Sequence, residues 1–277
     1  MAVSAKEVNQ LRQVTGAGMM DCKKALEEAG GDFDQAIDLL RKKGQKVSAS
    51  RQDREASEGA VFAEISADGS TAVMIELNCE TDFVARNDDF QGIGTAIVQQ
   101  ALKDKPADLA ALNQMQIGGK ALEATLTDAM GRIGEKLEVS KYALITGEKV
   151  ACYIHPGARV GVLTAFKGAN GADLSEVGKN VSMQIAAMNP IAVDKEGVDQ
   201  TVLNKEIEIG KEQARAEGKP EAMLEKIAMG KLSKFLKDNT LLHQEFVKDP
   251  SKTIAQYLKE KSDKLTVERF ERFHLGA

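Results

Sequence analysis

Apolar residues recur at helical spacing three times within residues 1–45. Ser4 and Glu7 have capping-box spacing in front of Val8 and Leu11, which predicts a first helix there. Two further sets have i, i+3, i+4, i+7 spacing: Cys22, Ala25, Leu26 and Ala29, then Phe33, Ala36, Ile37 and Leu40. Asp32 is placed to cap the third helix. Residues 1–45 are therefore predicted to form a three-helix module.

The pattern changes after this module from helical to strand-like. Gln45 to Ser57 is polar and basic without a period, so we interpret residues 46–59 as a linker with partial helical content at most. Residues 61–66 and 71–78 are rich in β-formers and flank Asp68-Gly69, a strong hairpin signal. A helix follows at 90–101, and we place a first core subdomain at 60–147.

The same order of elements returns further along the chain. A hairpin is predicted from 150–155 and 159–166 around Pro156-Gly157, followed by a helix at 174–188, within a second subdomain at 148–198. Aligning the two helices places Ile93-Gly94 on Val177-Gly178. A helix at 122–133 and a strand at 137–146 lie between the halves. We interpret the core as two related α/β subdomains with small antiparallel sheets.

The C-terminal third of the chain is predicted to be largely helical. Charged helical segments within 199–238 are split by Gly218-Lys219-Pro220, which predicts a helical hairpin arm. In residues 239–277 we expect a C-terminal helical module that returns to the core, with Pro250-Ser251 opening its amphipathic helix. The predicted fold class is α+β.

The connection between hairpin and helix differs between the two halves. The second reads Gly168 to Ala172 and has no bulky residue, whereas the first is longer and contains Glu80 to Arg86. One interpretation is that Thr81 or Asp82 caps a helical turn and Phe83 packs back against it. The other is that Thr81, Asp82, Phe83 and Val84 form an exposed tip that contacts another protein.

Composition excludes several classes of protein. The 277 residues are 43% hydrophobic and 29% charged, values typical of a globular chain. No membrane-spanning run and no signal peptide are recognised, so we expect a cytoplasmic location. The net charge of −5 makes nucleic acid an improbable main ligand. The spacing of Cys22, Cys79 and Cys152 indicates reduced thiols rather than a disulfide framework or a zinc site.

Motifs for catalysis or direct nucleotide binding are absent from the sequence. There is no GxxxxGK[ST] phosphate loop, no complete dinucleotide turn, no GxSxG elbow and no HExxH. His155 follows a strand beside Pro156-Gly157 and is interpreted as a turn residue rather than a base. The Asp88-Asp89 pair is expected to cap the following helix. We therefore expect no enzyme activity, no cofactor and no metal site.

Met19 and Met20 follow the Gly16-Ala17-Gly18 turn, and two interpretations stay open for them. Either one methionine lies in the small core and the other is tolerated on the surface, or they form an adaptable docking surface.

Four stretches make the chain resemble the bacterial elongation factor Ts family, the guanine nucleotide exchange factors of elongation factor Tu. They are TGAGMMDCKKAL at 15–26, NCETDFVAR at 78–86, GARVGVL at 157–163 and FVKDPSKTIAQYL at 246–258. The resemblance implies a ubiquitin-associated-like N-terminal module and a tip, here Asp82 and Phe83, that dislodges the partner's Mg²⁺. It also implies that Arg12, Met19 and Met20 touch the GTPase domain and that His155 touches the partner's third domain.

Two other functions fit parts of the sequence. A tethering adaptor would use Met19 and Met20 to bind a partner without accelerating nucleotide release. An RNA-binding accessory protein would use a basic stretch in which Asp53 is the only acidic residue: Arg41, Lys42, Lys43, Lys46, Arg51 and Arg54. Such a basic stretch is more often a solvated linker.

Overall fold

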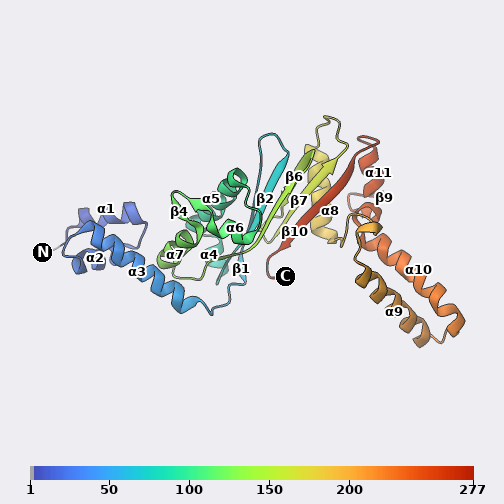
Figure 1. The fold of residues 1–277 in the computed structure, drawn as a ribbon, viewed down its shortest axis with the longest axis horizontal. Coiled ribbons are helices and arrows are strands. Elements are labelled where there is room, and N and C mark those ends of the chain that lie inside the picture. The colour runs from blue at the N-terminus through green and yellow to red at the C-terminus, as the bar shows by residue number, and fades with distance from the viewer. Residues whose placement is uncertain (1–2) are drawn as a thin grey trace.

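A computed structural model describes residues 3–277, and residues 1 and 2 of the predicted N-terminal module lie outside the described part. The molecule is elongated (Figure 1). Three helices form one end, two small sheets with their helices form the middle, and a helical hairpin projects at the other end. The predicted α+β class is confirmed, because helices and small antiparallel sheets both contribute to the core.

The N-terminal module consists of α1 (Ala5–Thr15), α2 (Met19–Glu28) and α3 (Phe33–Arg51). Ser4 and Glu7 form the predicted capping box, and Asp32 caps α3 by accepting a hydrogen bond from the N–H of Gln35. A small shared core holds the helices together: Val8, Leu11, Ala17, Cys22, Ala25, Leu26 and Ala36. The three helices predicted from the apolar spacing are confirmed.

Helix α3 is longer than predicted and replaces much of the expected linker. It continues to Arg51, and β1 begins at Glu58, so residues 46–51 of the predicted linker at 46–59 are helical, within the partial helical content that was expected. Gly44, which weakens a helix in isolation, lies where α3 crosses α7 (Leu122–Ile133). A Cβ atom on Gly131 of α7 would stand 2.7 Å from the Gly44 Cα. Two glycines therefore allow close packing that stabilises the extended helix.

The first sheet has the order β1-β2-β5, with all pairs antiparallel. Its strands are β1 (Glu58–Ile65), β2 (Thr71–Cys79) and β5 (Glu138–Thr146). The hairpin around Asp68-Gly69 is as predicted, and α5 (Asp88–Asp104) follows it. Asn87, rather than Asp88 or Asp89, caps α5, because its side chain accepts from the N–H of Asp89.

The second sheet repeats this plan with the order β6-β7-β10. Its strands are β6 (Lys149–Ile154), β7 (Val160–Lys167) and β10 (Thr266–His274), and α8 (Ser175–Met188) follows the hairpin. Strand β10 was not predicted from the sequence. This strand comes from the C-terminal end of the chain and pairs antiparallel with β7.

Corresponding glycines support the predicted duplication of the core. Each half contains a hairpin, then a helix, then a third strand that pairs with the second. A Cβ on Gly94 of α5 would stand 2.3 Å from the Phe62 ring, and one on Gly178 of α8 would stand 2.5 Å from the Ala151 Cβ. Phe62 and Ala151 lie on the first strands of their respective hairpins. Both helices thus approach their sheets closely at the positions that the sequence alignment matched.

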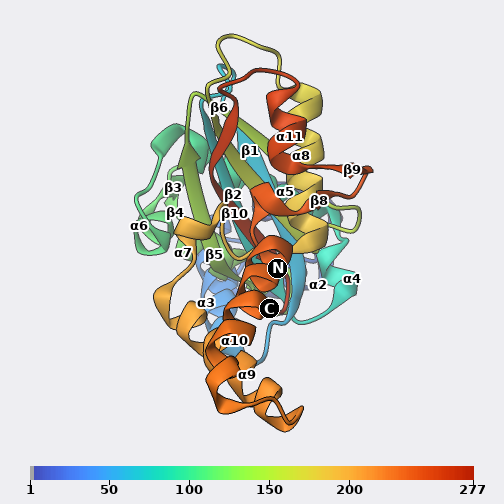
Figure 2. The same ribbon diagram turned by 90° about the vertical axis from the view of Figure 1, so that its right-hand side faces the viewer.

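The two sheets face each other, with helices on their outer faces (Figure 2). Side chains from both sheets form the layer between them: Val61, Ala72, Met74, Ile145, Leu163, Ala165 and Phe273. Helices α5 and α7 cover the outside of the first sheet, and α8 with α11 (Ile254–Lys259) covers the outside of the second. The middle of the molecule is therefore a helix–sheet–sheet–helix arrangement.

The remaining elements are short, apart from the arm. They are α6 (Leu109–Gln114), β3 (Gln116–Ile117), β4 (Lys120–Ala121), η1 (Lys195–Gly197), α9 (Gln200–Ala216), α10 (Glu221–Asn239), η2 (Leu241–His243), β8 (Glu245–Phe246) and β9 (Asp249–Thr253). Helices α9 and α10 form the predicted arm and approach closely where Gly210 meets Ala228.

The last helix begins later than predicted. Pro250 and Ser251 belong to β9, and α11 starts at Ile254 behind a capping box formed by Thr253 and Gln256. Proline is tolerated in β9 because that strand pairs only with the short β8 at the edge of a two-stranded sheet. Helix content after the arm is consequently small, and residues 266–274 return to the core as β10.

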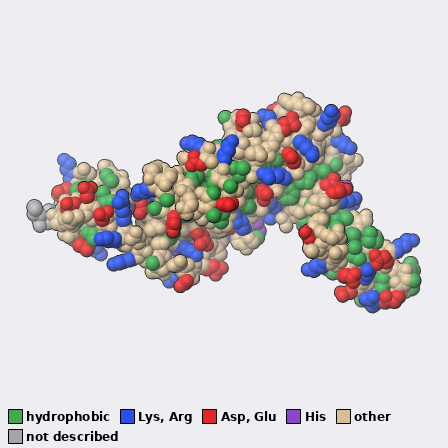
Figure 3. All heavy atoms as spheres, in the orientation of Figure 1, with side chains coloured by type: hydrophobic (Ala, Val, Ile, Leu, Met, Phe, Trp, Pro, Cys, Tyr) green, Lys and Arg blue, Asp and Glu red, His purple; other side chains and the backbone are tan. Residues whose placement is uncertain are grey.

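The basic stretch lies on and just after α3 rather than in a free linker. Lys43 pairs with Asp21 at 2.5 Å, and Arg51 pairs with Glu80 at 2.6 Å. On the face shown in Figure 3, acidic and basic side chains are interspersed along the molecule. Within residues 3–277, no helix combines the length and apolar character needed to cross a bilayer.

We predict that Gly94→Ala destabilises the fold by about 1–3 kcal/mol, because its methyl group would overlap Phe62. Gly92→Ala in the same helix is the matched control, since a Cβ there meets nothing within 4 Å. Alanine's higher helix propensity should make that variant about 0.5–1 kcal/mol more stable. Urea unfolding followed by circular dichroism measures both, and equal midpoints for the two variants would contradict the close helix–sheet contact.

Candidate functional site

The predicted tip is a single helical turn that carries an exposed aromatic side chain. Helix α4 (Asp82–Ala85) connects β2 to α5. Phe83 is 80% exposed, the highest value among the exposed large hydrophobic residues in the described part of the chain. A ring this exposed contributes little to the core and is available for contact with another protein.

The interpretation of residues 81–83 as a capped turn with Phe83 packed against it is half correct. Thr81 caps α4, with its hydroxyl oxygen accepting a hydrogen bond from the Val84 N–H at 3.4 Å. Phe83, however, does not pack back against the turn. The Asp82 carboxylate pairs with Arg86 one turn later at 2.8 Å; the Arg86 side chain is largely exposed and that of Asp82 is half-buried. The interpretation of Phe83 as a staple is therefore wrong.

The neighbours of Phe83 fix which way it points. Val84 is half-buried against the core of the first half, and Ala85 is buried within it. The Gln91 side-chain amide donates a 2.6 Å hydrogen bond to the Ala85 carbonyl. With Val84 and Ala85 held inward, the single turn projects Phe83 to the outside.

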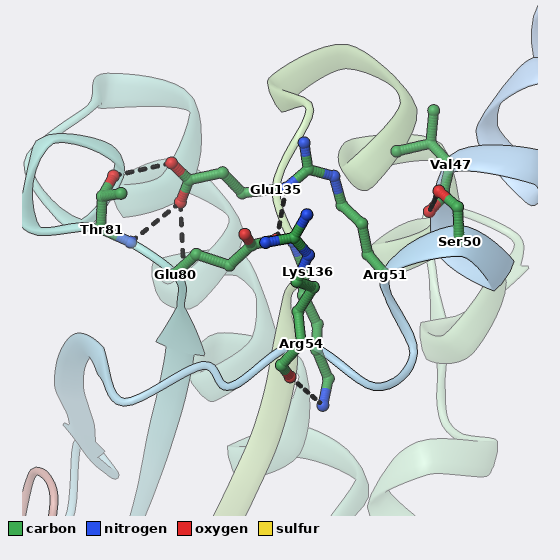
Figure 4. Close-up of polar contacts among 8 residues, drawn as sticks. All are labelled: Val47, Ser50, Arg51, Arg54, Glu80, Thr81, Glu135 and Lys136. Carbon is green, nitrogen blue, oxygen red and sulfur yellow. Dashed lines mark hydrogen bonds and ion pairs between the residues drawn. The ribbon is translucent and has the colours of Figure 1, made fainter.

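Glu135 supports the other end of the turn (Figure 4). Its carboxylate accepts hydrogen bonds from the N–H groups of Glu80 and Thr81 at 3.2 and 3.0 Å. It also accepts one from the Thr81 hydroxyl at 2.7 Å. Three donors of the tip segment thus converge on one carboxylate, and hydrogen bonds to an ionised acceptor are stronger than neutral ones.

Glu80 connects the tip to the N-terminal module. Its carboxylate accepts hydrogen bonds from the Lys136 N–H at 2.7 Å and from the guanidinium of Arg51, the last residue of α3, at 2.6 Å. Burial alone would raise the pKa of Glu80, but these two hydrogen bonds and the charge of Arg51 outweigh it and keep the pKa below its usual value. The ion pair therefore persists at neutral pH.

The other predicted contact residues lie elsewhere along the molecule. Met19 and Met20 are 57% and 62% exposed at the start of α2, so the interpretation that one of them is a core residue is wrong. Arg12 is exposed on α1. His155 is exposed in the turn after β6, and the Tyr153 hydroxyl lies 2.9 Å from its Nδ1. Helix α2, helix α4 and strand β6 are spread along the long axis rather than gathered in one cleft (Figure 1).

The geometry is that of a protrusion rather than a binding cavity. A groove of about 360 Å³ lies between the N-terminal module and α7, lined by residues such as Val14, Leu40 and Arg132 rather than by the tip. Across residues 3–277, His, Cys, Asp and Glu side chains form no group of three that could hold a metal ion.

The residues that support the tip were not predicted from the sequence. Glu80 lies in the motif at 78–86, which predicted contacts only for residues 81–84, and Arg51 was predicted to belong to the basic stretch. Glu135 and Lys136 are more than 50 residues from the tip in sequence and come beside it through the pairing of β2 with β5. Only the register of that strand pair could have indicated them.

Comparisons with known proteins agree with one another. A family model described as elongation factor TS matches residues 80–277. The elongation factor Ts of Amoebophilus asiaticus is 50% identical over 277 residues and covers 100% of both chains. Those of Cytophaga hutchinsonii and Chloroherpeton thalassium are 53% and 43% identical, with at least 98% of each chain covered.

We predict that the thiol beside the tip is unreactive in the folded protein. Burial raises the pKa of Cys79 to about 12 and that of Cys152 to about 12, so both stay protonated at pH 8. Alkylation by iodoacetamide at pH 8 should therefore be on the order of a hundredfold slower than in denaturant. Mass spectrometry of the labelled peptides measures this, and rapid labelling of native Cys79 would show that the end of β2 is open.

Proposed function

The chain belongs to the elongation factor Ts family of translation elongation, and we propose that it promotes GDP release from elongation factor Tu through the tip formed by Thr81, Asp82, Phe83 and Val84. The tip enters the GTPase near its Mg²⁺ and phosphate site. The observation that carries this proposal is the exposure of Phe83 on a turn whose Val84 and Ala85 side chains pack against the core. Exchange for GTP follows in the cytoplasm, without covalent chemistry and without a cofactor of this chain.

Linkage sets the condition for such a factor. It accelerates GDP release only if it binds the nucleotide-poor state of elongation factor Tu more tightly than the GDP-bound state. Burying the Phe83 ring in the partner contributes about 2–3 kcal/mol. Since about 1.4 kcal/mol corresponds to tenfold, the ring alone weakens nucleotide binding by roughly two orders of magnitude at most.

The remaining coupling comes from other surfaces. We assign Arg12, Met19 and Met20 to contacts with the GTPase domain and His155 to a contact with the third domain of elongation factor Tu. Their exposure supports this assignment, since flexible methionine side chains adapt well to a partner surface. The pairing of Lys43 and Arg51 with acidic residues counts against RNA as the alternative ligand.

Asp82 acts differently from Phe83. Its ion pair with Arg86 is an exposed i,i+4 pair, which holds the carboxylate weakly. The carboxylate can therefore turn towards the partner's metal site, where its negative charge disfavours the arrangement of Mg²⁺ and phosphates.

We predict that Phe83→Ala lowers the maximum rate of GDP release by about tenfold to a hundredfold, with a smaller loss of affinity for elongation factor Tu. Met229→Ala is the control, because Met229 is an exposed apolar residue of the arm, remote from the tip. Stopped-flow release of fluorescent GDP at increasing factor concentration separates rate from affinity. Wild-type release by Phe83→Ala would refute the role of the ring, and binding without acceleration by the unaltered chain would favour a tether.

We predict that Asp82→Asn slows GDP release at millimolar Mg²⁺ by about threefold to tenfold and that the difference disappears in excess EDTA. The substitution keeps the shape of the side chain and removes the charge that opposes the metal-bound arrangement. The same release assay with and without EDTA measures the effect. A deficit of equal size in both conditions would show that Asp82 does not act through the metal.

A further inference from the structure

Two chain segments beside the tip are joined by side chains where strand pairing stops. The β2–β5 ladder ends where Asn78 pairs with Glu138. Beyond it, Glu135 accepts hydrogen bonds from the main chain of residues 80 and 81, while Glu80 accepts one from the main chain of Lys136. Each segment therefore supplies a carboxylate that accepts hydrogen bonds from the main chain of the other segment (Figure 4). These hydrogen bonds hold the two segments together beyond the last residue pair of the ladder.

Helix α7 places Glu135 at this position. The helix ends at Ile133, and Gly134 follows as its C-cap with φ of 83°, a left-handed conformation that glycine adopts readily. This conformation of Gly134 sets the direction of the chain after α7 and so the position of Glu135, the next residue. Its carboxylate satisfies two consecutive N–H groups that have no ladder partner, in a half-buried location where unpaired donors are costly.

Thr81 transmits this placement to α4. Its hydroxyl donates to Glu135 at 2.7 Å, and the same oxygen accepts from the Val84 N–H at 3.4 Å. Glu135 therefore orients the hydroxyl that caps the turn. A helix of one turn is not stable by itself, because nucleation fixes several residues for few hydrogen bonds. Since Phe83 is 80% exposed, its position depends on the backbone of that turn.

We propose that Glu135 is a positioning residue for nucleotide exchange, acting through Thr81 to preorganise the turn that presents Phe83. This inference rests on the proposed function of the tip. A turn that is already ordered loses little conformational entropy on binding the partner. More of the free energy of the new contacts is then available to weaken nucleotide binding. Glu135 itself does not need to touch elongation factor Tu.

The experiment uses the full chain and GDP-loaded elongation factor Tu with fluorescent GDP. Glu135→Ala removes all three hydrogen bonds. Glu135→Gln keeps a carbonyl acceptor for the two N–H groups and reverses the third hydrogen bond, because its amide N–H donates to the Thr81 hydroxyl oxygen. The matched control is Glu138→Ala, which removes a nearby carboxylate paired only with the Lys136 ammonium at 3.0 Å. Thr81→Val removes the hydroxyl that links Glu135 to α4 and serves if Glu135→Ala fails to fold.

We expect Glu135→Ala and Thr81→Val to lower the maximum release rate roughly tenfold, below the roughly hundredfold that a 1 Å misplacement can cost. The factor concentration for half-maximal rate should stay within about twofold, because the other contact surfaces are intact. Glu135→Gln should stay within about threefold of the unaltered chain, and Glu138→Ala should be unchanged. In a Phe83→Ala background, Glu135→Ala should add less than about a twofold loss.

The outcomes separate this inference from the proposed function. If the unaltered chain does not accelerate GDP release, or if Phe83→Ala releases GDP as fast as the unaltered chain, the proposed function of the tip is refuted. If both behave as proposed but Glu135→Ala releases GDP at the full maximum rate, the positioning role is overturned. A loss of equal size in the Phe83→Ala background would overturn it as well, because Glu135 would then not act through the ring. A Glu135→Gln variant as slow as Glu135→Ala would overturn the hydrogen-bonding account.

Discussion

The packing of two three-stranded sheets against each other is the constraint on which the rest of the structure depends. Each sheet has one face covered by helices, and the two remaining faces bury a shared apolar layer that includes Met74, Leu163 and Phe273. Gly161 permits this contact, since a Cβ there would stand 2.5 Å from a methyl group of Val61. The tip, the arm and the N-terminal module are all attached to this double sheet.

Duplication explains how one half became specialised. The two halves share strand order and the glycine at which helix meets sheet, so the connection between hairpin and helix is equivalent in both. The second half makes the connection with small residues, which shows that folding requires nothing larger. The first half adds α4 with Phe83, and its side-chain supports lie at the edge of the sheet rather than within its core.

Local patterns in the sequence predicted what depends on local interactions. Helical spacing, caps and the Asp68-Gly69 turn gave the helices, the hairpins and the arm, because these elements bury one face at a fixed period. The extension of α3, strand β10 and the role of Glu135 were not predictable in this way. Gly44 disfavours a helix by its local propensity, and its close contact with Gly131 of α7 is visible only in the structure. Strand β10 depends on pairing with β7, which is distant in sequence. The exposure of Phe83 was one of two open interpretations, because the residues that hold α4 are distant in sequence.

The unbroken length of α3 has a consequence for how the molecule meets a partner. Its 19 residues span roughly 28 Å as a continuous helix. It is fixed near its middle by the glycine contact with α7 and at its end by Arg51 on Glu80. The N-terminal module is therefore connected to the core by a continuous, anchored helix rather than by a flexible linker. Once either the module or the tip has bound, the other is presented at a high effective concentration set by geometry, and a partner of the wrong dimensions cannot engage both.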